Sequence, residues 1–230
     1  MDPTRFFQIY VVMGLFGMFY SFIGIKILRR NPNVLNKIVS GFYFCSAAGA
    51  FLNVVYASIF IETMVWWLYA LTIVVLNFAP YFLLLFVLNL YTPKDIPSKL
   101  FQLVLTLLYA SLQGAVLLIP GAFRINEGTQ WKPEWSWIGF LYIFLVIIIV
   151  IVIPSTGLAV KMHSRFTDDT IKKRCRYFTA GMEIAYMMYL GALFSHALGS
   201  QAFRMTWSIL SLFLVIVSGL AMYHGIGKKL

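Results

Sequence analysis

Charged residues are scarce in this sequence of 230 residues. They make up 11% of it, against about 25% in average soluble domains, whereas 61% of the residues are hydrophobic and 17% are aromatic. A soluble domain of this length cannot hide so much apolar surface from water, but a lipid bilayer can surround it. The shortage of charge therefore excludes an ordinary soluble domain and indicates a membrane protein.

Cysteines and catalytic motifs are also rare or missing. Cys45 lies in an apolar run and Cys175 in a basic segment, and they are the only two cysteines, so neither a disulfide framework nor a cysteine-based metal site is expected. The sequence contains no HExxH, GxSxG or phosphate-loop motif, and no aspartate falls inside an apolar run. We therefore expect no enzymatic activity, no bound metal and no cofactor.

What the sequence does contain is a series of seven apolar runs of about twenty residues each, the length of a transmembrane helix. A barrel strand would instead alternate over about ten residues. The predicted spans are Phe7–Leu28, Lys37–Phe60, Met64–Leu90, Leu100–Pro120, Trp137–Val160, Tyr177–Leu198 and Met205–Tyr223. We expect residues 1–230 to form one all-α transmembrane domain, a seven-helix bundle.

Lysine and arginine are distributed unevenly between the two sides of this bundle. Four lie on one side: Arg5, Arg124, Lys132 and Arg204. The other fourteen lie opposite: Lys26, Arg29, Arg30, Lys37, Lys94, Lys99, Lys161, Arg165, Lys172, Lys173, Arg174, Arg176, Lys228 and Lys229. The positive-inside rule predicts a multi-pass protein of the cell membrane with its N-terminus outside and its C-terminus in the cytoplasm. The basic side then favours anionic lipids or an acidic protein as partners, and not nucleic acid.

All six tryptophans fall at the predicted outer boundary. One interpretation is an interfacial belt, because indole rings prefer the depth of the lipid head groups. The other is an aromatic outer mouth that binds an apolar or lipid-like ligand. The second interpretation gives the candidate ligand-binding residues Trp66, Tyr69, Trp137 and Trp207.

Glu183 is the only acidic residue well inside a predicted span. It lies about six residues from the cytoplasmic end of its helix, which is a depth of roughly 9 Å. A carboxylate at that depth is costly unless it is protonated, paired or hydrated. Lys26 is the candidate ionic partner and Asn89 the candidate hydrogen-bond partner. The group would serve either as a structural tie between helices or as a switch, proton site or ligand contact.

Three segments resemble the seven-helix sensor region that precedes many prokaryotic histidine kinases. They are Phe78–Thr92, with its Ala-Pro-Tyr start and Leu/Phe body, the basic segment Lys172–Arg176, and the ending Ala221–Leu230. The resemblance covers the predicted third to seventh spans and implies a sensory role in a prokaryotic membrane. Because the sequence ends where a linker and kinase would begin, we expect signalling to pass through a separate partner.

The sequence thus predicts a receptor-like sensory module that binds a small apolar or lipid-like ligand and signals through a separate cytoplasmic protein. Two alternatives stay open: an accessory structural subunit of a larger membrane complex, and a small transporter or channel. Membrane lipids are expected partners in each case, and a homo-oligomer is compatible with all three. An odd number of spans and few polar residues disfavour a transporter built from inverted repeats.

Overall fold

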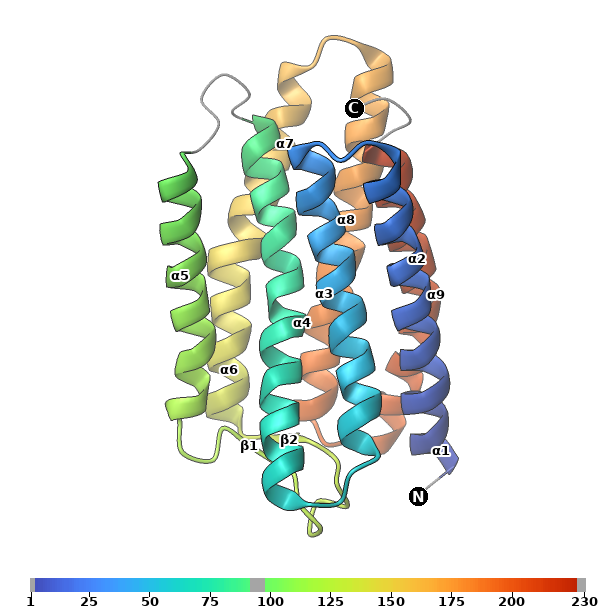
Figure 1. Ribbon diagram of the computed structural model, residues 1–230, viewed down its shortest axis with the longest axis vertical. Helices are drawn as coiled ribbons and strands as arrows, with labels where there is room; N and C mark the ends of the chain where they lie inside the picture. Colours follow the sequence, from blue (N-terminus) through green and yellow to red (C-terminus); the bar gives the residue numbers. More distant parts are fainter. Residues whose placement is uncertain (1–2, 92–97, 227–230) are drawn as a thin grey trace.

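The computed structural model describes residues 3–91 and 98–226. Seven long helical columns run side by side along one axis (Figure 1). The first column joins α1 (Pro3–Phe6), η1 (Phe7–Met13) and α2 (Gly14–Arg30), and the next are α3 (Val34–Ala57) and α4 (Glu62–Tyr91). The fourth joins α5 (Lys99–Ala115) to η2 (Val116–Leu118), and the fifth joins α6 (Trp137–Val146), η3 (Ile147–Val152) and α7 (Ile153–Arg165). The last two are α8 (Asp169–Ala197) and α9 (Gln201–Ile226).

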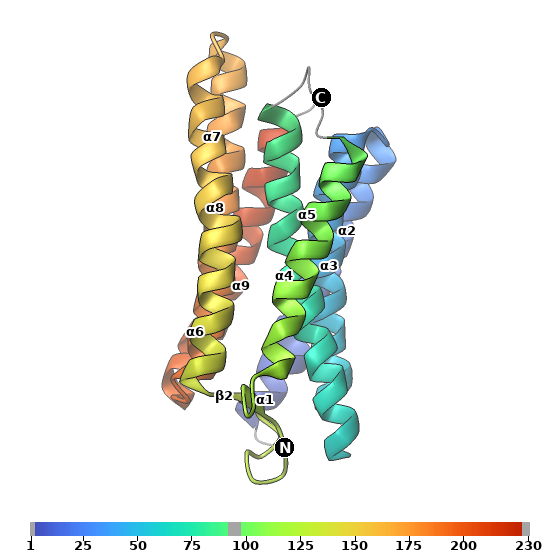
Figure 2. The same cartoon turned by 90° about the vertical axis from the view of Figure 1, so that its left-hand side faces the viewer.

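The two ends of the bundle differ. At one end, called here the loop end, the segment between η2 and α6 forms a cap with a short antiparallel pair, β1 (Phe123–Arg124) and β2 (Glu134–Trp135). At the other end, the basic end, α7 and α8 form a helical hairpin that projects beyond the neighbouring helices (Figures 1 and 2). The first column begins at the loop end, and α9 ends at the basic end.

Six of the columns are long and apolar enough to cross a membrane, which makes this an all-α, multi-pass membrane protein. The column that misses this criterion is α8, because even the part beyond its basic first turns contains polar residues such as Glu183, Tyr186 and His196. Its direction nevertheless follows from its neighbours. Since α7 ends at the basic end and α9 begins at the loop end, the chain between them must traverse the full bundle in α8.

Short polar side chains cap the starts of several helices. They accept hydrogen bonds from backbone N–H groups that have no partner within the helix. These caps are Asn33 on α3, Ser98 on α5, Ser136 on α6 and Asp168 on α8. At the tip of the hairpin, the backbone N–H groups of Thr170 and Ile171 donate to the Asp168 carboxylate, which lowers the pKa of that carboxyl. The cap therefore remains charged at neutral pH and fixes the turn between α7 and α8.

The interior divides into two apolar clusters. The larger one is built around Tyr43, Phe86 and Tyr186, and the smaller one lies at the loop end around Tyr69 and Phe123. Many large apolar side chains on the outer faces are exposed, which suits helices surrounded by lipid. Polar side chains inside the bundle tie helices together. The Asn77 amide of α4 donates to Gln113 of α5 at 2.9 Å, and the Tyr109 hydroxyl donates to the Asn77 carbonyl at 2.7 Å.

The predicted spans correspond to the observed columns, although the helices extend beyond several of the predicted limits. The predicted span Tyr177–Leu198 is the largest departure, since α8 begins at Asp169 and carries two further turns into the hairpin. Pro154, which has no N–H to donate, lies at the change from η3 to α7. Of the predicted basic side, Lys94, Lys228 and Lys229 lie outside the described residues, as do parts of two of the segments that carry the resemblance.

Candidate functional site

The cap at the loop end packs on the outer ends of α3 and α4 through aromatic side chains. Trp135 of β2 donates its indole N–H to the Tyr69 hydroxyl at 2.6 Å, and both side chains are buried. Phe123 of β1 stacks on Trp66 with ring centroids 5.3 Å apart. These contacts hold the cap as a packed layer over the bundle, so it forms a fixed wall for whatever lies beneath it.

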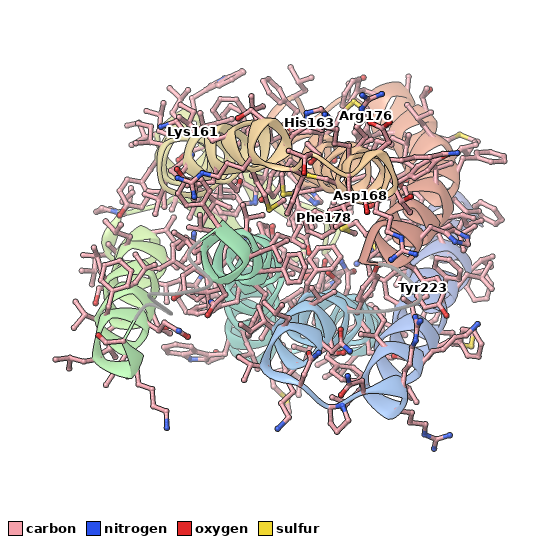
Figure 3. All side chains as sticks on the ribbon, turned by 90° about the horizontal axis from the view of Figure 1, so that it is seen from above. Lys161, His163, Asp168, Arg176, Phe178 and Tyr223 are labelled. Atoms are coloured by element: carbon pink, nitrogen blue, oxygen red, sulfur yellow. The ribbon has the colours of Figure 1, made fainter. Side chains whose placement is uncertain are left out.

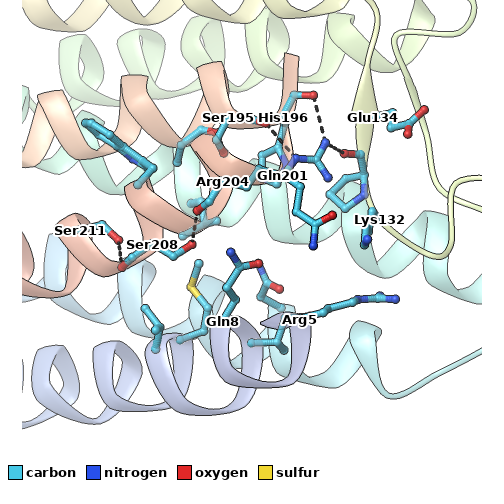
Figure 4. Close-up of a pocket in the computed structure, with 18 of the residues that line it drawn as sticks. Arg5, Gln8, Lys132, Glu134, Ser195, His196, Gln201, Arg204, Ser208 and Ser211 are labelled. Atoms are coloured by element: carbon cyan, nitrogen blue, oxygen red, sulfur yellow. Dashed lines mark hydrogen bonds between the residues drawn. The ribbon is translucent and has the colours of Figure 1, made fainter. Parts of the chain in front are cut away.

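A cavity of about 460 Å³ lies beneath the cap, between the first column, α3, α8 and α9 (Figure 4). That volume falls in the range of small-molecule sites, about 300–1,000 Å³. On the first column the lining extends from Arg5 to Phe16, which is roughly 15 Å along a helix. The cavity is therefore elongated along the helix axes.

The part of the cavity next to the cap is polar and basic. Arg204 of α9 donates through Nε to the Ser195 carbonyl at 2.9 Å and through Nη2 to the Pro133 carbonyl at 3.1 Å. Arg5 donates to the carbonyls of Gln130 and Trp131, each at 2.6 Å. Burial lowers the pKa of the Arg5 guanidinium, which still stays protonated because an arginine pKa starts above 12. Both guanidinium groups thus bind the cap to the helices and bring positive charge to the cavity.

The part of the cavity farther from the cap is mostly apolar. Its lining residues are Met13, Phe16, Met188, Leu212 and Val215. The wall on the first column includes η1, a seven-residue π-helix. A π-helix is rare and often marks a functional site, because the wider turn displaces the side chains that follow it. Together, the two parts form a site with a polar mouth and a hydrocarbon-like interior.

The four aromatic residues predicted to bind a ligand do not surround a common cavity. Trp207 lines the cavity. Trp66 and Tyr69 instead belong to the packed layer under the cap, and the Trp137 side chain is 56% exposed on the outside of α6. The prediction of a shared site is wrong for these three, because hydropathy places a residue along a helix axis but does not say which way its side chain faces.

Glu183 does not pair with Lys26 or with Asn89. Its carboxylate accepts a hydrogen bond from the Thr156 hydroxyl of α7 at 2.6 Å. The Lys26 ammonium instead lies 5.1 Å from the ring centre of Tyr223 on α9. The Asn89 amide donates to the Leu85 carbonyl at 2.7 Å. The predicted partners are wrong because Glu183 faces α7, whereas Lys26 projects from α2 on the other side of α9. Glu183 also lines a shallow groove on the outside of α8.

The basic residues expected on the outer side mark the cavity. Only four basic residues were expected on the outer side, where lysine and arginine are normally depleted. Three of these four, Arg5, Lys132 and Arg204, line the cavity. Basic residues on the side that the charge rule depletes were therefore better markers of this site than the tryptophans. His196, a histidine at the loop end of α8, also lines it.

The hairpin of α7 and α8 is the second region with functional potential (Figure 3). Between Lys161 and Arg176 it carries six basic residues and two acidic ones. The Arg176 guanidinium donates to His163 at 3.0 Å, and the Arg165 guanidinium stacks on the Tyr91 ring at 3.9 Å. The hairpin thus presents a positive surface while its base is held against α4.

The cavity is suited to binding. Guanidinium groups hold acceptor atoms, and the inner wall accommodates hydrocarbon. Within residues 3–91 and 98–226, no three His, Cys, Asp or Glu side chains are placed to hold a metal ion. No protein family model matches the chain, and neither a curated protein nor a solved structure shows significant similarity to it.

Proposed function

We propose that this protein is a receptor-like membrane module that binds a small lipid-like molecule in the loop-end cavity and passes the binding event to a separate cytoplasmic partner. The cavity is the observation that carries the proposal. It is large enough for a small ligand, lies at one end of the bundle and combines a basic mouth with an apolar interior.

The distribution of charge supports an orientation with the loop end outside the cell. Among the described residues, the basic side includes Arg29, Arg30 and the hairpin, which the positive-inside rule assigns to the cytoplasm. In a variant whose two native cysteines are replaced, Glu127→Cys in the cap should react with a membrane-impermeant thiol reagent in intact cells. Asp169→Cys in the hairpin should react only after lysis, and labelling of this variant in intact cells would reverse the orientation.

The same helix connects the two regions. One end of α8 contributes Met188, Ser195 and His196 to the cavity, and its other end forms half of the basic hairpin. A ligand that shifts or rigidifies α8 at the cavity therefore acts on the element that carries the partner surface. Such coupling requires that the ligand interact differently with two arrangements of the helix. The resemblance to the sensor region of histidine kinases is compatible with this proposal.

An accessory subunit is the second candidate, and α5 is the observation that favours it. This helix stands at the edge of the bundle, and only 17% of its most apolar stretch of 18 residues is buried inside the protein. Leu103, Leu107 and Leu108 are all more than half exposed. Lipid alone can cover such a face, so exposure does not require a protein partner. The cavity, which an accessory role leaves unexplained, makes the receptor the preferred function.

Filling the cavity tests the proposal. Ala192 lines it, so Ala192→Trp should occupy the space that a ligand needs. Ile149 is 59% exposed on the outer face of η3, so Ile149→Trp adds the same side chain outside the cavity. We expect a small amphiphile to co-purify in mild detergent with the wild type and with Ile149→Trp, but not with Ala192→Trp. Equal amphiphile content in all three, or none in the wild type, would contradict the proposed function.

A further inference from the structure

Two buried polar atoms at the cavity have no hydrogen-bond partner. They are the indole Nε1 of Trp207 and the imidazole Nδ1 of His196. Both side chains line the cavity, but the two atoms themselves are enclosed by protein. Buried polar atoms are nearly always paired, because an unpaired one loses its hydration without compensation. An indole N–H can only donate. The partner that Trp207 lacks must therefore be an acceptor.

The Arg204 guanidinium, which lines the cavity, has a hydrogen-bond donor that is not used by its contacts with the protein. Its Nε and Nη2 donate to the carbonyls of Ser195, Pro133 and His196. Its Nη1 has no hydrogen bond within the described part of the chain. All of its partners are neutral carbonyl oxygens, and no described carboxylate forms an ion pair with it. Three hydrogen bonds thus hold the guanidinium in place, and no counter-ion pairs with its charge within residues 3–91 and 98–226.

Positive charges outnumber negative ones around the cavity mouth. Arg5, Lys132 and Arg204 line it, and Glu134 is the only acidic residue among the lining residues. The Glu134 side chain is exposed on the cap. Figure 4 shows Arg5 on the first column, Lys132 on the cap and Arg204 on α9 at the same end of the cavity. A site with this surplus of positive charge favours an anion over a neutral or cationic group of similar size.

From these contacts we propose that the ligand is an amphiphile with an anionic head group, such as a carboxylate. The head binds at Arg204, and the Trp207 ring turns so that its N–H, which is enclosed and unpaired in the absence of a ligand, donates to the head. The hydrocarbon tail extends between α2 and α9 toward Phe16 and Val215. This inference rests on the proposed function, since it names the chemistry of the molecule that the cavity binds. A cavity of about 460 Å³ suits a single chain better than a whole two-chain phospholipid.

Three probes of equal chain length and different head groups test this chemistry: decanoate, decanol and decyltrimethylammonium. The wild-type protein in nanodiscs of zwitterionic lipid is dialysed against each radiolabelled probe, with empty nanodiscs as the blank. We expect decanoate to be retained at least about tenfold more tightly than the other two, the value of one charge-assisted hydrogen bond. Retention of all three alike would overturn the anionic head group but leave the cavity as a binding site. Retention of none would overturn the proposed function itself.

Matched variants locate the head group. Trp207→Phe keeps an aromatic ring stacked on Phe203 but removes the N–H, and it should weaken decanoate retention several-fold. The control is Trp137→Phe on the lipid-facing side of α6, which should leave decanoate retention unchanged. Arg204→Gln should weaken it at least about tenfold, and Arg204→Lys should restore part of the loss because the charge remains. If both tryptophan variants retain decanoate equally and Arg204→Gln has no effect, the head group does not bind at Arg204 and Trp207.

An anionic head group can also belong to a lipid of the bilayer. Repeating the decanoate measurement in nanodiscs that contain phosphatidylglycerol separates the two sources. A loss of decanoate retention there would identify an anionic membrane lipid as a competitor for the site. Unchanged retention would identify a free amphiphile as the ligand. Failure of the anionic probe in zwitterionic nanodiscs, with decanol retained, would overturn the inference regardless of source.

Discussion

The seam between α8 and α9 is built differently in its two halves. Toward the basic end the two backbones touch, since a Cβ added to Gly181 or Gly225 would meet backbone atoms of the facing helix within 3 Å. Toward the loop end the helices leave the cavity between them, and the Trp207 ring fills the space above Gly191. One half of the seam is thus closed by direct backbone contact, and the other half has room for a ligand.

This difference suggests how the pair works. Close contact at Gly181 gives α8 and α9 a fixed point from which little sliding is possible. Around the cavity, side chains and empty volume separate the two helices, which are joined there through the hydrogen bonds of Arg204 and not by backbone contact. A ligand between them would therefore tilt one helix against the other about the closed half, and the hairpin beyond that point would move with α8.

The largest predicted effect comes from forcing apart the closed half of the seam. Gly181→Val places a branched side chain against the Ser218 carbonyl and the Met222 backbone, and should lower the free energy of unfolding by about 3 kcal/mol. Gly157→Val on α7 is the matched control, because nothing lies within 4 Å of an added Cβ there. Unfolding in mixed micelles measures both. Equal losses for the two variants would mean that the seam is not closed at Gly181.

A smaller effect is expected from the two arginines at opposite ends. Arg204→Gln removes charged donors to three carbonyls that join α9 to α8 and to the cap, and should cost about 2 kcal/mol. Arg176→Gln at the basic end removes one exposed contact with His163 and should cost less than about 0.5 kcal/mol. The same unfolding assay compares them. A larger loss for Arg176→Gln would show that the hairpin, not the cap, depends on arginine for its stability.

The smallest effect concerns Glu183, which lies beside the closed half. Thr156→Val removes the hydroxyl that donates to its carboxylate, and the coupling between Thr156→Val and Glu183→Gln should be about 1 kcal/mol. Lys26→Met combined with Glu183→Gln should give additive losses, because the two side chains do not touch. A double-mutant cycle measures both pairs, and coupling of Glu183 to Lys26 but not to Thr156 would contradict the observed contacts.

The helices could be predicted from the sequence because a bilayer demands about twenty apolar residues for each crossing. The run Met205–Tyr223 identified α9 within a few residues. The basic start of α8 obscured its beginning, since polar residues at Asp169–Arg176 resemble a loop. An apolar run says little about the rotation of a helix, and for that reason the sequence does not show that Glu183 faces α7.

The cavity could not be predicted from the aromatic residues. Tyr69 and Trp135 are far apart in sequence, and their hydrogen bond depends on a cap whose fold has no hydropathy signal. Whether an aromatic ring packs in a core or lines a cavity is decided by such contacts. The positions of the basic residues indicated the cavity better than the aromatic residues did. Arg5 and Arg204 stand on the side where cations are disfavoured, and both line the cavity.

The central claim is that a ligand in the loop-end cavity changes the arrangement of the hairpin at the basic end. To measure it directly, the native cysteines are replaced, Thr170→Cys at the tip of the hairpin is labelled with an environment-sensitive fluorophore, and decanoate is added to the protein in zwitterionic nanodiscs. The emission should change with saturating dependence on decanoate in this protein and in one that also carries Ile149→Trp, but not in one that carries Ala192→Trp. An emission that does not respond to bound decanoate, or that responds equally when the cavity is filled, would contradict the account.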